Sequence, residues 1–172
     1  RYSEGLYKNT FIGRTFIMPG QAERKKSVKY KLVPQELEIR DKKVLIVDDS
    51  IVRGNTSREI VRMLKDFGAK EVYFAVACPP VKSPCFYGVD MPTKSELIAG
   101  NMNEDEIGKY LEVDALLYQN IDDLVEAVTR KGDHHIDTPC MACLDGNYVV
   151  NDIDEAKIAE METMRVNDRN GK

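Results

Sequence analysis

Two adjacent carboxylates, Asp48 and Asp49, follow directly on the apolar run Val44–Val47, and a turn of small and polar residues then leads to Thr56 and Ser57. Paired acids suit the neighbouring hydroxyls of a sugar, or a hard cation such as Mg²⁺ that prefers oxygen ligands. Hydroxyls and backbone N–H groups at the start of a helix suit a phosphate. A phosphorylated sugar with a bound Mg²⁺ would satisfy both halves of this pattern.

The elements that must position these groups can be read from the flanking residues. Four apolar residues bounded by charge are typical of a strand that is buried on both faces of a parallel sheet. After the turn, apolar residues recur at helical spacing from Ile60 to Phe67, Gly68 stands where a C-terminal cap belongs, and a second apolar strand follows at Val72–Ala77. The pattern predicts a βαβ unit with the acids at the carboxyl edge of its sheet, where ligands bind in open α/β folds.

The alternation of strands and helices continues along the chain. The remaining predicted elements are a short helix near 96–99 with a Thr93/Glu96 capping box, a second ending near Tyr110 with an Asn103/Glu106 capping box, a strand at Ala115–Tyr118, a helix from Asn120 to about Gly132, an irregular stretch at 133–147 and a final helix at 154–165.

The stretch from Lys8 to Lys31 has no helical or strand periodicity and is rich in Lys and Arg, with a turn signal at Pro19-Gly20. On composition alone, the simpler interpretation is a solvated basic surface loop. A loop that neutralises a bound anion is the alternative.

The cysteines form a second group of interest. Cys140 and Cys143 have the spacing of zinc or iron–sulfur ligands, but a single Cys-x-x-Cys is equally compatible with two ordinary loop thiols. Cys78 precedes two prolines at the end of a predicted strand, so we expect it to be a packed thiol. Four cysteines are too few and too unevenly spaced for a secreted disulfide scaffold, which favours a reducing compartment.

Composition excludes several classes of protein. A hydrophobic fraction of 42% with 31% charged residues is that of a folded domain, and no apolar run is long enough to span a membrane. With 25 Lys+Arg against 29 Asp+Glu there is no general positive field for a nucleic acid, so any anion site must be local. Because the first residue is Arg1 and not Met, we expect the chain to be a fragment.

The run from Val44 to Ser57 resembles the phosphoribosyl pyrophosphate (PRPP) motif of the type I phosphoribosyltransferases. Its surroundings are similar to those of the amidophosphoribosyltransferase family. The segments that carry this similarity are Lys8-Asn9, Ile12–Ile17, Lys25–Lys31, Asp48–Ser57, Pro84–Asp90 and Glu96–Ala99.

The resemblance implies a fold and a domain organisation. The fold is the α/β type I phosphoribosyltransferase fold, a mostly parallel sheet flanked by helices, present as a partial domain with a C-terminal helical tail. Residues 1–132 would be the phosphoribosyltransferase domain without its N-terminal strands, and residues 133–172 a cysteine-bearing segment and helix. A glutaminase domain would precede them in the same chain.

The resemblance also implies an activity in which ammonia derived from glutamine displaces pyrophosphate from PRPP. The product is 5-phosphoribosylamine, the first intermediate of purine synthesis, and the enzyme would be a cytoplasmic homo-oligomer. Asp48 and Asp49 would hold the ribose hydroxyls and Mg²⁺, while the segment Lys8–Lys31 would close over PRPP. The residues expected to wrap its 5′-phosphate are Ser50, Ile51, Val52, Arg53, Gly54, Asn55, Thr56 and Ser57, and those expected to neutralise pyrophosphate are Arg14 with Lys29 or Lys31.

Some members of the family carry a [4Fe–4S] cluster. The resemblance makes Cys85, Cys140 and Cys143 three of its ligands, with the fourth upstream.

Three other interpretations stay open on sequence alone. One is a regulatory module of phosphoribosyltransferase fold that binds PRPP without catalysis, and another is a different type I phosphoribosyltransferase. A receiver domain also ends a strand in an acid pair, but Gly54-Asn55-Thr56-Ser57 would serve no evident purpose there.

Overall fold

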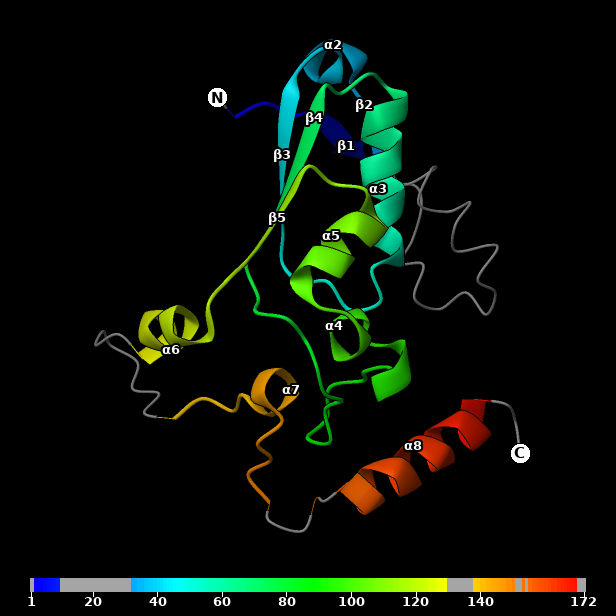
Figure 1. Ribbon diagram of the computed structural model, residues 1–172, viewed down its shortest axis with the longest axis vertical. Helices are drawn as coiled ribbons and strands as arrows, with labels where there is room; N and C mark the ends of the chain where they lie inside the picture. The colour runs from blue at the N-terminus through cyan, green and yellow to red at the C-terminus, as the bar shows by residue number, and fades with distance from the viewer. Residues whose placement is uncertain (1, 10–31, 130–137, 151–152, 154, 170–172) are drawn as a thin grey trace. The chain divides into compact units, whose positions relative to one another are not determined.

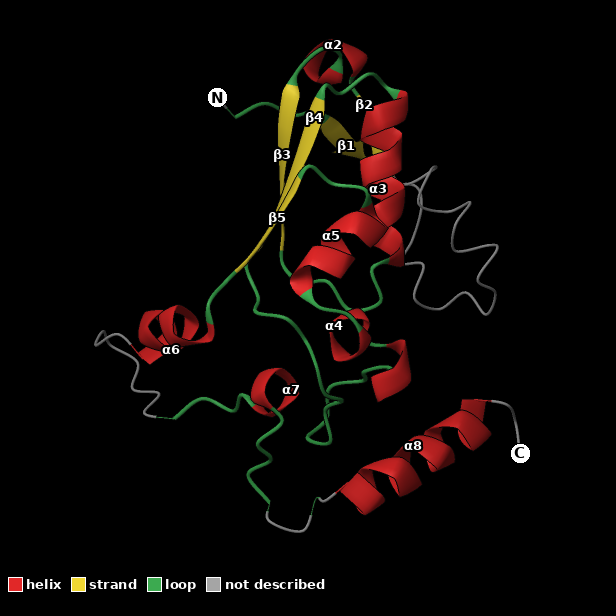
Figure 2. Cartoon of the chain, viewed as in Figure 1, coloured by secondary structure: helices red, strands yellow, loops and turns green. Residues whose placement is uncertain are grey.

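The computed structural model describes residues 2–9, 32–129, 138–150, 153 and 155–169. The described residues fold as two compact units. The first is made of those within 2–9, 32–49, 53–76 and 103–117, and the second of those within 50–52, 77–102, 118–129, 138–150, 153 and 155–169. Figure 1 labels the elements and Figure 2 distinguishes strands from helices. The strands are β1 (Leu6–Lys8), β2 (Leu32–Pro34), β3 (Lys43–Asp48), β4 (Glu71–Val76) and β5 (Ala115–Tyr118). The helices are α2 (Glu36–Ile39), α3 (Asn55–Asp66), the 3-10 helix η2 (Lys94–Glu96), α4 (Ile98–Asn101), α5 (Glu104–Leu111), α6 (Ile121–Thr129), α7 (Ala142–Asp145) and α8 (Glu155–Arg169).

The first unit is built on a three-stranded sheet in the order β3-β4-β5. β3 and β4 are parallel, with Val44 opposite Val72 and Asp48 opposite Val76. Every second residue of β4 is buried, because α3 packs against this strand on one side of the sheet (Figure 1). The predicted βαβ unit is confirmed, with strand bounds one residue from those expected.

Local capping signals set the helix ends of this unit. Gly68 follows α3 in the left-handed conformation with φ 85°, as its place in the sequence predicts. Asn103 Oδ1 accepts from the Glu106 backbone N–H at 2.9 Å, and the Glu106 carboxylate accepts from the Asn103 N–H at 2.8 Å. The predicted capping box of α5 is therefore confirmed.

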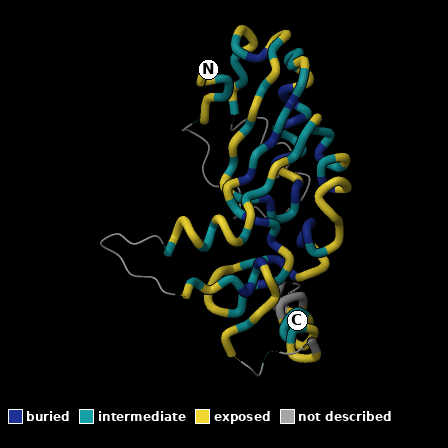
Figure 3. The backbone as a smooth tube through the Cα atoms, turned by 60° about the vertical axis from the view of Figure 1, so that its left-hand side comes forward, coloured by how far each residue is buried: buried dark blue, intermediate teal, exposed yellow. Residues whose placement is uncertain are grey.

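β3 differs from its prediction as a strand buried on both faces. Its residues alternate in exposure, with Leu45 58% and Val47 70% exposed, and Leu117 of β5 is 57% exposed (Figure 3). The side chains that alternate with Leu45 and Val47 are less exposed and face the core. The apolar run therefore predicted the strand correctly, but not the exposure of its second face. Burial of the second face depends on what covers it, and nothing in the described residues does so.

Antiparallel pairing of β1 with β2 places Lys8 opposite Leu32. Lys8 is therefore the last residue of a strand and not the start of the predicted basic loop. The two ends of the intervening stretch are held side by side, whereas residues 10–31 lie outside the described residues.

The second unit has its own small core of Val81, Leu97 and Leu144. The predicted capping box at Thr93 and Glu96 is confirmed, although the turn it opens is the 3-10 helix η2, with α4 after it. α4 lies close to two backbone segments, since a Cβ on Gly100 would stand 3.0 Å from the Lys82 carbonyl oxygen and 3.2 Å from that of Lys94.

The C-terminal part of the chain holds the helices α6, α7 and α8. α7 interrupts the stretch 133–147 that was predicted to be irregular, because a single helical turn at 142–145 is too short to give a periodic pattern. α8 confirms the predicted final helix and runs further, to Arg169, and α6 confirms the helix that precedes it. Among the described residues, no helix combines the length and the apolar character needed to cross a bilayer.

Candidate functional site

The acid pair ends β3, as the sequence predicts. Asp48 is the last residue of the strand and is partly buried, whereas Asp49 is exposed. The Asp49 backbone N–H donates to Asp48 Oδ1 at 3.0 Å, which fixes the direction of the first carboxylate. Burial raises the pKa of Asp48 and outweighs the opposite effect of this hydrogen bond, and the charge of Asp49 raises it further. A partly desolvated carboxylate beside a second one favours a cation or sugar hydroxyls as a partner.

The turn after the acids is anchored through its apolar residues. The Ile51 side chain is only 2% exposed. Val52 packs against the core of the second unit, and its carbonyl accepts from the Ile98 N–H at 2.9 Å. Because the Ile51 side chain is buried, any contact of Ile51 with a ligand would have to come from its main chain.

Helix α3 begins at the end of this turn. Its N-cap is Gly54, a buried residue in the left-handed conformation with φ 75°, which has no side chain that could cap the helix. Asn55 and Thr56 are exposed, whereas Ser57 is 4% exposed. The first N–H groups of an α-helix have no partner within the helix and carry partial positive charge, so this end is suited to a phosphate.

The predicted site residues from Asp48 to Ser57 thus occupy one strand end, one turn and one helix start. Carboxylates at one end of this segment can hold a cation and hydroxyls, and the backbone N–H groups at the other end can hold an anion. Arg14, Lys29 and Lys31 lie outside the described residues.

Sequence reasoning missed a polar network that connects α3 to the end of α5. Arg58 donates to Glu112 Oε1 at 2.9 Å through Nη2, and Arg62 does so at 2.6 Å. These hydrogen bonds from Arg62 and then Arg58 hold the pKa of Glu112 below its usual range. The Arg58 guanidinium lies 4.5 Å from the Tyr110 ring centroid, and the Tyr110 hydroxyl donates to Asn55 Oδ1 at 3.0 Å. The partners are 50 to 55 residues apart, so the only available signal was the placement of two arginines one helical turn apart.

The second unit brings together the two cysteine-bearing segments. The backbone N–H groups of Lys82 and Ser83 donate to the Cys143 carbonyl at 2.9 and 3.0 Å, which ties the segment before Cys85 to α7. Burial raises the pKa of the Cys143 thiol, and Cys85 and Cys140 add to this effect. Cys78 is partly buried and packs at the same core, as expected for a packed thiol. No set of three or more metal-ligating side chains is preassembled in the part of the chain that the structure describes.

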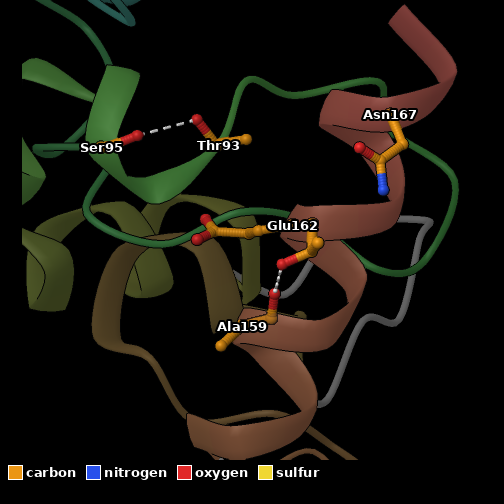
Figure 4. Close-up of a pocket in the computed structure, with 6 residues that line it drawn as sticks. Thr93, Ser95, Ala159, Glu162 and Asn167 are labelled. Atoms are coloured by element: carbon orange, nitrogen blue, oxygen red, sulfur yellow. Dashed lines mark hydrogen bonds between the residues drawn. The ribbon is translucent and has the colours of Figure 1, made fainter. Parts of the chain in front are cut away.

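A hollow of about 380 Å³ lies between the η2 region and α8 (Figure 4). Thr93 and Ser95 line one side of it, and Ala159, Glu162 and Asn167 line the other. The Glu162 carboxylate accepts the Lys94 backbone N–H, so part of its hydrogen-bonding capacity is already used within the fold. None of the predicted site residues lines this hollow.

Comparison with known proteins identifies the domain to which the strand end belongs. The sequence-family model described as the phosphoribosyl transferase domain matches residues 11–90, which include the acid pair and the start of α3. An amidophosphoribosyltransferase from Pseudomonas aeruginosa is 49% identical over 165 residues, or 96% of this chain. The chain belongs to the amidophosphoribosyltransferase family. It spans about a third of that relative's length, 33%.

Solved amidophosphoribosyltransferase structures extend the agreement to the fold. A glutamine PRPP amidotransferase from B. subtilis, complexed with ADP and GMP, is 41% identical with a TM-score of 0.70, and the match covers 90% of this chain and 34% of that one. A structure described as the allosteric regulatory enzyme of purine biosynthesis is 40% identical with a TM-score of 0.75, and covers 94% of this chain and 35% of that one. The expected α/β type I phosphoribosyltransferase fold is confirmed as a partial domain.

Proposed function

We propose that this amidophosphoribosyltransferase chain supplies the PRPP site of an enzyme that transfers ammonia from glutamine to PRPP. The ammonia nitrogen forms a bond to C1 of the ribose as the bond from C1 to the pyrophosphate oxygen breaks. The products are 5-phosphoribosylamine, pyrophosphate and a proton, and this reaction opens purine synthesis. The observation that carries the proposal is the acid pair at the end of β3, followed by the start of α3, where the N-cap glycine has no capping side chain.

Asp48 and Asp49 have the donor chemistry for the ribose hydroxyls and for Mg²⁺. Both offer carboxylate oxygens, which Mg²⁺ prefers, and the partial burial of Asp48 strengthens its attraction for a cation. Bound there, Mg²⁺ would supply positive charge against the developing pyrophosphate. The two carboxylates orient the ribose for displacement at C1.

The turn and the helix start have the donors for the 5′-phosphate. We assign its binding to the main chain of residues 50–54 and to Asn55, Thr56 and Ser57 at the N-terminus of α3. Arg14 with Lys29 or Lys31 are proposed to neutralise the leaving pyrophosphate, because charge must be stabilised where it develops.

The proposal includes the surroundings of the site. Residues 1–132 are assigned to the phosphoribosyltransferase domain and 133–172 to a C-terminal segment. Because the relatives are about three times longer, we propose that a glutaminase domain of the same chain delivers the ammonia. The enzyme would be a homo-oligomer of the cytoplasm, with neither a nucleic acid nor a membrane as partner. Because the similar proteins are named as transferases, we favour a catalytic role over that of a PRPP-binding regulatory module.

The direct test is pyrophosphate release from PRPP by the whole enzyme with saturating ammonium as the amino donor, which bypasses the glutaminase. We expect release that requires PRPP, Mg²⁺ and ammonium together, and the same product with glutamine. Binding of PRPP without any pyrophosphate release would instead identify a regulatory module.

We further propose that Cys85, Cys140 and Cys143 hold a [4Fe–4S] cluster together with a fourth cysteine further upstream in the whole enzyme. The close approach of the two cysteine segments supports this assignment. The fit is incomplete, because three ligands are not preassembled among the described residues, so cluster binding would have to draw the thiols together. Its role would be structural, since it would join the segment before Cys85 to α7.

This prediction is tested by measuring the iron and acid-labile sulfide content of anaerobically purified whole enzyme. We expect about four of each per chain in the unaltered enzyme, a loss of both in Cys85→Ser, and retention of both in Cys78→Ser. Cys78 is the matched control because it is a partly buried thiol of the same core that is assigned no iron. An unaltered enzyme without iron, or a Cys85→Ser variant that keeps its iron, would show that the three thiols are ordinary residues.

A further inference from the structure

Asn55 is held from outside its own helix. It is the first residue of α3 and is exposed, and its side-chain oxygen accepts the Tyr110 hydroxyl at 3.0 Å. An asparagine amide has one acceptor end and one donor end. Because Tyr110 occupies the oxygen, the Nδ2 group, which can only donate, is turned to the other side.

Tyr110 is itself held in place by charged residues. The Arg58 guanidinium lies over the Tyr110 ring, 4.5 Å from its centroid, in cation–π geometry. Glu112 Oε1 fixes the guanidinium through Nε at 3.3 Å and Nη2 at 2.9 Å. Glu112 ends α5 in the left-handed conformation, φ 64°, which a residue other than glycine adopts only where its surroundings hold it. The chain of contacts from Glu112 to Asn55 therefore has a defined geometry at each step.

We propose that Tyr110 is a positioning residue for the phosphate-binding end of α3, and that it acts by directing the Asn55 amide N–H groups toward the 5′-phosphate of PRPP. This inference rests on the proposed function, since it concerns the same phosphate. Tyr110 touches Asn55 and not the substrate. Its loss should therefore weaken the binding of PRPP and leave the bond-breaking step at C1 intact.

Tyr110→Phe removes the hydroxyl and keeps the ring under Arg58. In the whole enzyme with ammonium as amino donor, we expect the KM for PRPP to rise about fivefold, as for one lost hydrogen bond, while kcat stays within about twofold. A role in stability alone would lower the melting temperature without this division between KM and kcat.

Tyr73→Phe is the matched control. The Tyr73 hydroxyl also bonds a neighbouring side chain, that of Glu71, but at the amino end of β4. Glu71 lies opposite Lys43 at the amino end of β3, whereas Asp48 is at the carboxyl end of that strand. The same atom is therefore lost away from the acid pair, and the KM for PRPP should not change.

A double-mutant cycle decides whether Tyr110 acts through Asn55. We expect Asn55→Ala to raise the KM for PRPP about tenfold, and Tyr110→Phe to add nothing in that background, because the residue it orients is gone. The inference would be wrong if the double variant raised the KM for PRPP by the product of the two single increases. It would also be wrong if Tyr110→Phe alone left the KM unaltered. Neither result would contradict the proposed function. An unaltered enzyme that releases no pyrophosphate from PRPP would overturn both.

Discussion

The double variant Asp48→Asn with Asp49→Asn abolishes PRPP turnover, by at least about a hundredfold, and leaves the fold intact. Neutral amides cannot hold Mg²⁺ or orient the ribose hydroxyls as carboxylates do, and removal of one preorganised electrostatic group from an active site commonly costs this much. Stability should be unchanged or slightly higher at neutral pH. Burial raises the pKa of Asp48, so its ionised form is disfavoured in the folded chain, and the amide oxygen that replaces the carboxylate can still accept the N–H of the next residue.

Steady-state pyrophosphate release and thermal unfolding of the whole enzyme measure the two halves of this prediction. The matched control is Asp122→Asn with Asp123→Asn, which removes the same two charges from adjacent exposed acids in the first turn of α6. The control should retain full turnover. If the Asp48→Asn, Asp49→Asn variant retained its turnover, the assignment of these two acids to the PRPP site would be wrong.

Gly54→Ala lowers both PRPP affinity and stability. Gly54 has φ 75°, and a residue with a Cβ occupies this left-handed region at a cost of about 1–2 kcal/mol. If the chain relaxes to a negative φ, the N–H groups of the first turn of α3 no longer point in their present direction. We therefore expect the KM for PRPP to rise at least about tenfold, or about 1.4 kcal/mol, in addition to the loss of stability.

Gly68→Ala separates the two effects. Gly68 has φ 85° at the other end of the same helix, and a Cβ there meets only ordinary contacts with Arg40, the nearest atom at 3.5 Å. Both variants should show a lower melting temperature, and only Gly54→Ala should change the KM for PRPP. Equal kinetics in the two variants would mean that the backbone at Gly54 does not shape the phosphate site.

The elements around the acid pair could be predicted because their signals are local. An apolar run before Asp48, a glycine at the start of α3 and another after its end, and the capping box at Asn103 each act within a few residues. The strand-to-helix turn that carries the candidate site is built from such signals, so its outline was available from the sequence.

The features that were missed depend on contacts between distant parts of the chain. The pairing of β1 with β2 joins strands of three residues each across a long interval, and so short a strand has no periodicity to detect. The bonds from Arg58 and Arg62 to Glu112 likewise require α3 and α5 to be packed together first. The exposure of Leu45 and Val47 depends on what covers the sheet and not on the residues themselves.

The exposed face of β3 governs how this stretch of chain behaves in solution. β3 is also an edge strand of the described sheet, so an apolar surface and a row of backbone hydrogen-bonding groups lie next to each other. Such edges template pairing with other chains, and sulfate or phosphate salts strengthen apolar association. Self-association that increases with concentration and with these salts is the expected colloidal behaviour, and light scattering across a salt series would record it.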